Sequence, residues 1–252
     1  IAGLCLVGLY LGYILVRVVI APQSMPPAER TDDVALAPVL GALAPPLLLI
    51  VAVLGSILGG YATPTEAAGV GAFGALLLGL IYGRIDRQVL SEVGSGTLST
   101  TGMVFFILVG ASIFSLVFRG YGGDEMVQAL FAQMPGGMWG ALGIVMLVIF
   151  LLGFILDFIE ITFVVVPIVG PVLMAMGVDP IWLGVLIAVN LQTSFLTPPF
   201  GFALFYLRGV APPQVTTGEI YRGVLPFIGL QLALLAALLI WPGLATWLPS
   251  QL

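Results

Sequence analysis

Residues 181–208 read IWLGVLIAVNLQTSFLTPPFGFALFYLR, an apolar helical stretch that is interrupted at Leu196-Thr197-Pro198-Pro199-Phe200-Gly201. Proline has no amide hydrogen and forces the preceding residue out of the α-helical region, so Pro198 and Pro199 break the helix. Irregular backbone survives at membrane depth only where protein or a watered cavity satisfies its polar groups. The stretch therefore predicts a membrane helix that is broken midway at a binding site.

The rest of the chain has the composition of a membrane protein. Of its 252 residues, 60% are hydrophobic and 8% are charged, against about 25% charged residues in an average globular domain. About 20 apolar helical residues cross the hydrocarbon core of a bilayer. The segments apolar enough to enter it are 1–20, 38–58, 64–82, 97–118, 138–156, 161–176, 181–208 and 220–246. The predicted fold class is an all-α polytopic membrane protein.

The inventory of reactive groups excludes most enzyme chemistries. The chain has no His and a single Cys, so it can assemble neither a Ser-His-Asp site nor a His/Cys zinc site. An intramembrane aspartyl hydrolase would need two close carboxylates, and Asp157 has no second Asp in a comparable intramembrane motif. A net charge of −5 without basic clusters argues against nucleic acid as a partner. We expect that the protein is not an enzyme and that it binds no cofactor.

A re-entrant hairpin is predicted ahead of the broken helix. Residues 138–156 and 161–176 are joined by Asp157-Phe158-Ile159-Glu160 without a turn-rich polar loop. Asp157 and Glu160 would share one helix face, and a carboxylate inside a membrane is a functional candidate by default. We assign Asp157 to ion or substrate binding and Glu160 to gating or positioning; alternatively, the tip reaches headgroups or water and both carboxylates are solvated.

The break itself combines groups that suit a cation on one side and an anion on the other. Pro198 and Pro199 deprive the carbonyls of Ser194 and Phe195 of their helical donors, and oxygen ligands of this kind suit sodium. The positive N-terminal end of helix 200–208 suits an anionic substrate group. A proline-kinked helix repaired by its neighbours is the alternative. The candidate sodium and substrate site comprises Asp157, Asn190, Gln192, Thr193, Ser194, Phe195, Thr197, Pro198, Pro199 and Gly201, with the ion itself at Thr193, Ser194, Phe195 and Thr197.

Two motifs nearer the N-terminus favour structural interpretations. Thr63-Pro64-Thr65-Glu66 has the spacing of a helix capping box, although Glu66 is also a candidate for gating. Residues 69–74 match G-x-G-x-x-G, but no strand precedes them, and small residues allow close packing of membrane helices. Arginines flank or occupy the connections near 21–37 and 83–95, which predicts that both loops are cytoplasmic.

The blocks ATPTEAAGVGAFGALLLGLIYGR (62–84), LLGFILDFIEITFVVVPIVGPVLMAMGVDPIWLGVLIAVNLQTSFLTPPFGFALFYLRGVAP (151–212) and IYRGVLPFIGLQLALLA (220–236) resemble the large membrane subunit of tripartite ATP-independent periplasmic (TRAP) transporters, most closely its mannitol/chloroaromatic branch. The resemblance implies an elevator-type symporter of the bacterial inner membrane with sodium as coupling ion. Its partners would be a small membrane subunit and a periplasmic binding protein that delivers an organic anion, often a carboxylate.

The resemblance also implies a division of the chain. Residues 1–135 would be mainly scaffold helices, residues 136–210 would carry the transport elements, and residues 211–252 would form a C-terminal transmembrane helix. The transport elements would be hairpin 138–176 and broken helix 181–208. Elevator transporters of this kind contain two inverted repeats, and the sequence shows one hairpin and one such break, so it resembles the C-terminal half of a large subunit. A stand-alone sodium/dicarboxylate carrier and a structural membrane subunit that does not transport are the alternatives.

Overall fold

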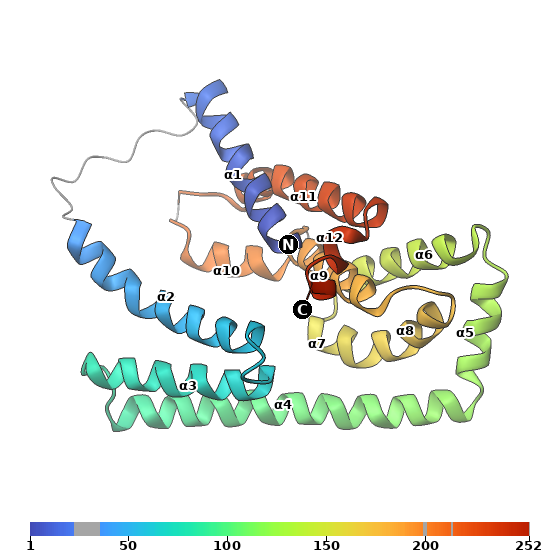
Figure 1. Cartoon of the computed structure of the whole chain (residues 1–252), viewed down its shortest axis with the longest axis horizontal. Coiled ribbons are helices and arrows are strands. Elements are labelled where there is room, and N and C mark those ends of the chain that lie inside the picture. The colour runs from blue at the N-terminus through green and yellow to red at the C-terminus, as the bar shows by residue number, and fades with distance from the viewer. Residues whose placement is uncertain (23–35, 199–200, 213, 252) are drawn as a thin grey trace. The chain divides into compact units, whose positions relative to one another are not determined.

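The described part of the chain is helical. The structure, a computed structural model, describes residues 1–22, 36–198, 201–212 and 214–251, and all regular elements within these ranges are helices (Figure 1). They are α1 (Ala2–Ile20), α2 (Leu36–Leu58), α3 (Pro64–Ile81), α4 (Arg87–Gly120), α5 (Gly123–Ala132), α6 (Gly137–Leu152), α7 (Phe158–Glu160), the π-helical η2 (Ile161–Val165), α8 (Val166–Ala175), α9 (Pro180–Leu196), α10 (Phe202–Val210), α11 (Thr217–Ile240), α12 (Gly243–Thr246) and the 3₁₀ turn η3 (Pro249–Gln251). The predicted all-α class is confirmed.

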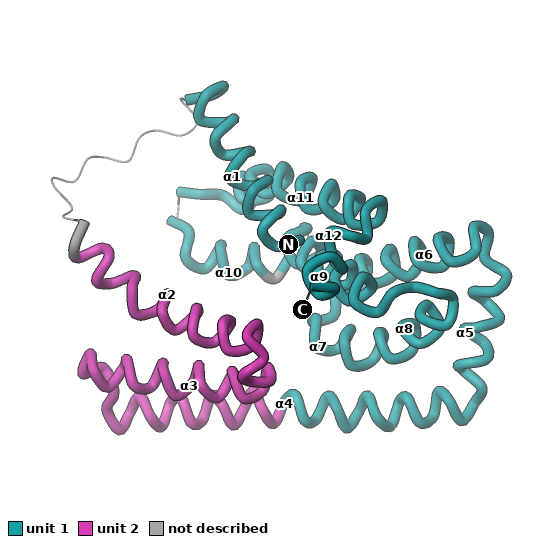
Figure 2. Tube along the Cα trace, viewed as in Figure 1, with its two compact units in different colours: residues 1–25, 103–252 teal, residues 26–102 magenta. Residues whose placement is uncertain are grey.

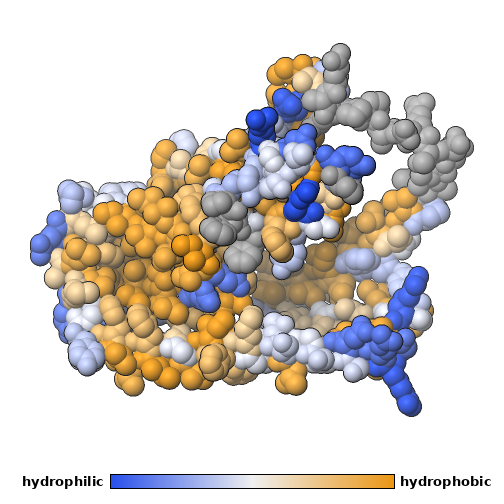
Figure 3. All heavy atoms as spheres, turned by 180° about the vertical axis from the view of Figure 1, so that it is seen from behind, coloured by the Kyte–Doolittle hydropathy of each residue, from blue (hydrophilic) through white to orange (hydrophobic). Residues whose placement is uncertain are grey.

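Among the described residues, 6 helical segments are long and apolar enough to cross a membrane. They are α1, α2 from Pro38, α3, α4, the continuous arm Phe158–Ala175 and α11, while α6 and α9 are shorter apolar helices. Figure 3 shows the extensive hydrophobic surface that these helices leave exposed on one face. A bilayer is the environment in which such a surface is stable, so the chain is a multi-pass membrane protein.

The chain forms two compact units, residues 1–25 with 103–252 (unit 1) and residues 26–102 (unit 2) (Figure 2). In unit 2, α2 packs against α3. A Cβ atom on Gly71 would lie 3.3 Å from the side chain of Val53, and one on Gly74 would overlap Leu49. Two glycines of the G-x-G-x-x-G stretch therefore let α3 approach α2 closely, in agreement with its interpretation as a packing motif.

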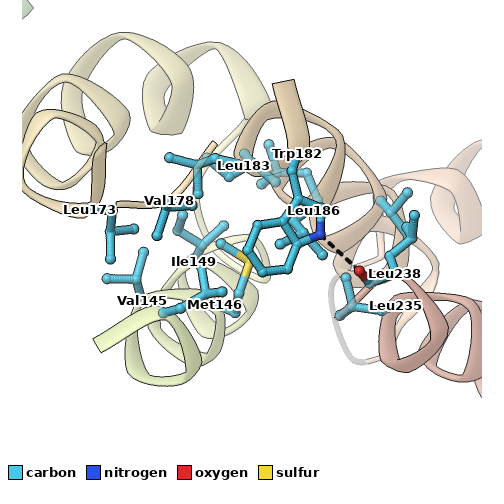
Figure 4. Packing of buried hydrophobic residues seen from close by; sticks show 14 of the residues in the cluster. Val145, Met146, Ile149, Leu173, Val178, Trp182, Leu183, Leu186, Leu235 and Leu238 are labelled. Carbon is cyan, nitrogen blue, oxygen red and sulfur yellow. Dashed lines mark hydrogen bonds between the residues drawn. The ribbon is translucent and has the colours of Figure 1, made fainter. Parts of the chain in front are cut away.

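The core of unit 1 joins the hairpin helices to α9 and α11. Its fully buried side chains include Ile149 of α6, Leu173 of α8, Leu186 of α9 and Leu238 of α11 (Figure 4). The Trp182 indole N–H donates to the Leu238 carbonyl at 2.8 Å. Because Pro242 has no amide hydrogen, that carbonyl lacks its α-helical donor, and the indole replaces it. The bond fixes the N-terminal turn of α9 to the C-terminal turn of α11.

Helix α1 also packs within unit 1, against α11. The rings of Tyr10 and Tyr13 make edge-to-face contacts with Phe227, with centroids 5.1 and 5.3 Å apart. Unit 1 thus unites α1 and α11 with the hairpin and the broken helix, whereas the sequence-based division separated them. A unit defined by packing is not a test of which parts move, so the division into scaffold and transport elements stays a prediction.

Several predicted boundaries shift for local reasons. Helix α4 begins at Arg87, so the loop predicted over 83–95 is helical for most of its length, and only its first residues connect α3 to α4. Helix α11 begins at Thr217 because Thr216 and Glu219 form a capping box, and it ends at Ile240, ahead of Pro242. Most of the predicted loop 21–37 lies outside the described residues.

Candidate functional site

A helical hairpin is present where one was predicted, with its turn earlier in the sequence than expected; that it re-enters the membrane stays a prediction. Helix α6 forms the first arm and packs against η2 and α8 of the second. The turn occupies residues 153–157, not 157–160, and Phe158–Glu160 is already the first turn of the second arm. Asp157 is the N-cap of this arm, and its carboxylate accepts a hydrogen bond of 2.7 Å from the Phe158 amide. A good N-cap residue at 157 explains why the helix starts there.

The second arm contains a π-helical segment that the sequence analysis missed. In η2, the Val166 amide donates to the Ile161 carbonyl, five residues back. The Thr162 carbonyl thereby loses its α-helical donor, and its π-helical donor would be Pro167, which has no amide hydrogen. Segments of this type occur frequently at functional sites. The Thr162 carbonyl is thus a backbone oxygen without an α- or π-helical donor.

Helix α9 is joined to the hairpin at three levels. The Asn190 amide nitrogen, in a side chain that is 1% exposed, donates to the Met146 carbonyl of α6 at 2.7 Å. One helical turn further along α9, Ser194 lies against Gly153 so closely that a Cβ atom on the glycine would overlap its hydroxyl. Beyond the turn, the Phe158 and Phe195 rings lie 6.1 Å apart. These contacts bring the start of the second hairpin arm to the end of α9.

The helix break between α9 and α10 is confirmed, and one of its carbonyls is satisfied in a way that was not predicted. The Thr197 amide donates to the Ser194 carbonyl at 3.0 Å, so Pro198 does not leave this oxygen free. The Thr197 hydroxyl in turn donates to the Thr193 carbonyl at 2.7 Å, which would otherwise accept the Thr197 amide. Thr197 therefore serves both carbonyls. Pro199 and Phe200 lie outside the described residues.

The hydroxyls at the end of α9 present lone pairs, not hydrogens, to their surroundings. Thr193 donates to the Val189 carbonyl at 2.7 Å and Ser194 to the Leu191 carbonyl at 2.8 Å. Because each hydroxyl has a single hydrogen and that hydrogen is already donated, the oxygen can only accept toward any ligand. Both side chains are fully buried. Buried oxygens that can only accept suit a cation.

A cavity of about 450 Å³ lies between α9 and the second hairpin arm. It is lined by Phe158, Thr162, Val166, Gly184, Ile187, Ala188, Leu191, Gln192 and Phe195. Gln192 and Phe195 of the predicted site face it, whereas Asn190, Thr193 and Ser194 are fully buried side chains outside its lining. The predicted cluster is thus divided between two faces of α9. Thr162 is the residue that the structure adds.

The two glutamates of the prediction have different surroundings. Glu66 belongs to unit 2, where it closes the predicted capping box: its carboxylate accepts from the Thr63 amide at 2.8 Å, and its own amide donates to the Thr63 hydroxyl. Glu160 is half-buried, and its side chain makes no hydrogen bond or ion pair with any described residue. Its assignment to gating or positioning stays a prediction.

Within the described ranges, no three Asp, Glu, Cys or His residues cluster as metal ligands. The oxygens available around the break are hydroxyls, side-chain amides and backbone carbonyls, joined by the single carboxylates of Asp157 and Glu160 on the hairpin. Such a set suits a weakly held monovalent cation better than a divalent metal, which favours several carboxylates.

Gly201 is the N-cap residue of α10, where the helix resumes after the break. Its replacement tests the backbone geometry of the break. A Cβ atom there would lie 2.7 Å from the Phe195 carbonyl oxygen and 3.2 Å from that of Thr197. We expect Gly201→Ala to lower the thermal stability of the purified protein by about 1–3 kcal/mol, because backbone atoms cannot yield as a flexible side chain does. Gly209→Ala is the control, since a Cβ atom on that glycine of α10 meets nothing within 4 Å. Equal melting temperatures for both variants would contradict the described break.

A multi-pass membrane chain with a helical hairpin packed on a broken helix is consistent with the architecture of secondary transporter permeases. Residues 1–244 match the family model described as "Tripartite ATP-independent periplasmic transporter, DctM component". The chain belongs to this family of transporter permeases and is a multi-pass protein of the bacterial inner membrane.

Three curated relatives illustrate the match. The sialic acid TRAP transporter large permease protein SiaM of Vibrio cholerae is 30% identical over 205 residues, which cover 81% of this chain and 48% of the relative. The C4-dicarboxylate protein DctM of Pseudomonas aeruginosa is 31% identical over 211 residues (82% and 48%). The isethionate permease protein DctMQ of Oleidesulfovibrio alaskensis is 34% identical over 194 residues (75% and 30%). The chain spans about half the length of most such relatives.

Proposed function

We propose that this chain supplies one half of the ion and substrate site in a sodium-driven TRAP permease that imports an organic anion. The observation that carries the proposal is the packing of the hairpin on α9: Asn190 donates to the Met146 carbonyl of the first arm, and Ser194 contacts Gly153 at the hairpin turn. Transporters with inverted repeats hold their ions and substrates where such elements meet.

Sodium is the proposed coupling ion because the oxygens near the break are neutral and can only accept. The hydroxyls of Thr193, Ser194 and Thr197 donate their hydrogens to α9 carbonyls, which leaves their lone pairs for a ligand. The negative C-terminal end of α9 favours a cation in the same region. Asp157, the N-cap of the second hairpin arm, would offset the charge of the ion when it binds.

An organic anion is the proposed substrate. Helix α10 has 9 residues and presents its N-terminal end at the break. The amides of its first two residues, Phe202 and Ala203, have no intrahelical acceptors, so they suit a carboxylate or sulfonate group. The names of three relatives specify sialic acid, a C4-dicarboxylate and isethionate, all organic acids. A periplasmic binding protein would select among such acids and deliver the substrate, and a small membrane subunit would complete the permease.

Uptake into proteoliposomes tests the proposal. A complete large subunit that carries this sequence is reconstituted with its small subunit, and labelled organic acids are followed with and without an inward sodium gradient and a binding protein. We expect uptake that requires both. Uptake that ignores the binding protein would favour a stand-alone carrier, and uptake that ignores the sodium gradient would refute sodium coupling. A complex that assembles but transports no acid from a broad panel would favour a structural subunit.

A further inference from the structure

A second cavity, of about 680 Å³, lies within unit 2 between α2 and α3, and the proposed transport function does not use it. Its walls are Gly41, Ala42, Pro45 and Pro46 of α2 and Leu78, Gly79, Tyr82 and Arg84 at the end of α3. The α2 residues lie near the start of the span Pro38–Leu58, and Tyr82 and Arg84 lie just beyond the end of the span Pro64–Ile81. The cavity is therefore at the level where hydrocarbon meets headgroups.

The α2 wall carries backbone acceptors without their helical donors. Pro45 and Pro46 lie inside the helix and have no amide hydrogen, so the carbonyls of Gly41 and Ala42 lose their α-helical donors. A Cβ atom on Gly41 would meet nothing within 4 Å, so open space adjoins the backbone there. Carbonyls without their α-helical donors at the membrane boundary can accept a hydrogen bond from a group outside the helix.

The opposite wall carries the guanidinium of Arg84. The Arg84 guanidinium makes no side-chain hydrogen bond or ion pair with any residue that the structure describes. Its backbone amide donates to the Gly79 carbonyl at 2.9 Å, which fixes the chain where α3 ends. Arginine binds phosphate with two parallel hydrogen bonds, and the nearby Tyr82 is typical of membrane interfaces.

We propose that this cavity binds the headgroup of an aminophospholipid. The phosphate would accept from Arg84 and Tyr82, and the primary ammonium would donate to the carbonyls of Gly41 and Ala42. A purely cationic ligand would face the guanidinium, and an anionic headgroup could offer the two carbonyls at most a neutral hydroxyl donor. A zwitterion with N–H donors satisfies both walls with charge-assisted hydrogen bonds. Pro45, Pro46 and Leu78 form the apolar part of the lining, which favours a lipid with an acyl chain over a soluble headgroup.

Native mass spectrometry of the purified protein, titrated with short-chain lipids, tests this site. Phosphatidylethanolamine should bind about tenfold more tightly than phosphatidylcholine, whose trimethylated nitrogen has no N–H donor, and than phosphatidylglycerol, which has no ammonium. Glycerophosphoethanolamine, the soluble headgroup, should not displace the bound lipid at equal concentration; if it does, the site takes a soluble zwitterion and the lipid assignment is wrong.

Two variants separate the two walls. Arg84→Gln should weaken phosphatidylethanolamine binding about tenfold, because a charge-assisted phosphate contact is lost. Pro46→Ala restores an amide that can donate to the Ala42 carbonyl but leaves the Gly41 carbonyl without its donor, so it should narrow the difference in affinity between phosphatidylethanolamine and phosphatidylcholine while α2 stays helical. Arg87→Gln is the control, since Arg87 lies outside the cavity lining. Equal binding of all three lipids, or binding unchanged in both variants, would overturn the proposal.

Discussion

Gly153→Val is expected to lower substrate uptake by the complete transporter by about tenfold or more, and to lower its thermal stability. Gly153 ends the first hairpin arm, and a side chain there would overlap the hydroxyl and Cβ of Ser194 on α9. Inserting methyl groups into a packed contact costs about 1–3 kcal/mol. Because this contact joins the hairpin turn to the helix break, the strain falls directly on the proposed site. Uptake in proteoliposomes and melting of the purified protein measure the two effects.

Gly143→Val is the matched control on the same helix. A Cβ atom on Gly143 meets nothing within 4 Å and the residue is exposed, so this variant should transport and melt like the wild type. A further check is Gly153→Ala combined with Ser194→Gly, which removes the atoms that the new methyl group would strike. We expect the double variant to melt above Gly153→Ala alone. If the two melt together, the hairpin does not contact α9 in the way described.

Asp157→Asn is expected to raise the sodium concentration needed for half-maximal uptake by about tenfold, because the proposed ion loses a nearby negative charge. The variant is informative because Asn is as good an N-cap as Asp. Its side-chain oxygen can still accept from the Phe158 amide, which Asp157 now receives at 2.7 Å. The second hairpin arm should therefore keep its start, and only the charge changes.

Asp157→Ala supplies the comparison, since it removes both the charge and the cap. We expect it to raise the sodium requirement as Asp157→Asn does and, in addition, to lower thermal stability by about 1 kcal/mol. The sodium dependence is read from uptake at a series of sodium concentrations with constant ionic strength. If Asp157→Asn behaves like the wild type while Asp157→Ala loses uptake, the carboxylate positions the turn and plays no part in coupling.

The elements that the sequence predicts well are those set by local chemistry. The break predicted at Pro198 and Pro199 lies between α9 and α10, and Thr63 with Glu66 caps α3 as their spacing indicates. A proline pair alone does not end a helix, since α2 continues through Pro45 and Pro46. The division of the polar cluster was also within reach, because Asn190 and Ser194 are four residues apart on one helix face while Gln192 points elsewhere. The prediction that all of these polar residues form one site did not take into account which face of the helix each of them occupies.

Other features depend on partners distant in sequence. The sequence around Gly153 does not indicate that a glycine is needed there, because the close contact is with Ser194 on another helix. The hydrogen bond from the Trp182 indole to the Leu238 carbonyl depends on the packing of α9 against α11. The sequence indicates only that this carbonyl lacks its α-helical donor, because residue 242 is a proline. The π-helical segment had a partial signal in Pro167, which deprives one earlier carbonyl of a donor. The hairpin turn lies earlier in the sequence than predicted because Asp157 caps the start of the second hairpin arm and is not at the centre of the turn.

The central claim, that the hairpin and the broken helix of this chain hold sodium, is tested most directly by ion-specific stabilisation. The purified large subunit that carries this sequence is melted in rising concentrations of NaCl and of KCl at constant ionic strength, as the wild type, Thr197→Ser and Thr197→Val. We predict a saturable rise in melting temperature with NaCl only, kept in Thr197→Ser and lost in Thr197→Val, which has no hydroxyl for the Thr193 carbonyl or for the ion. Identical melting in the two salts for the wild type would contradict the claim.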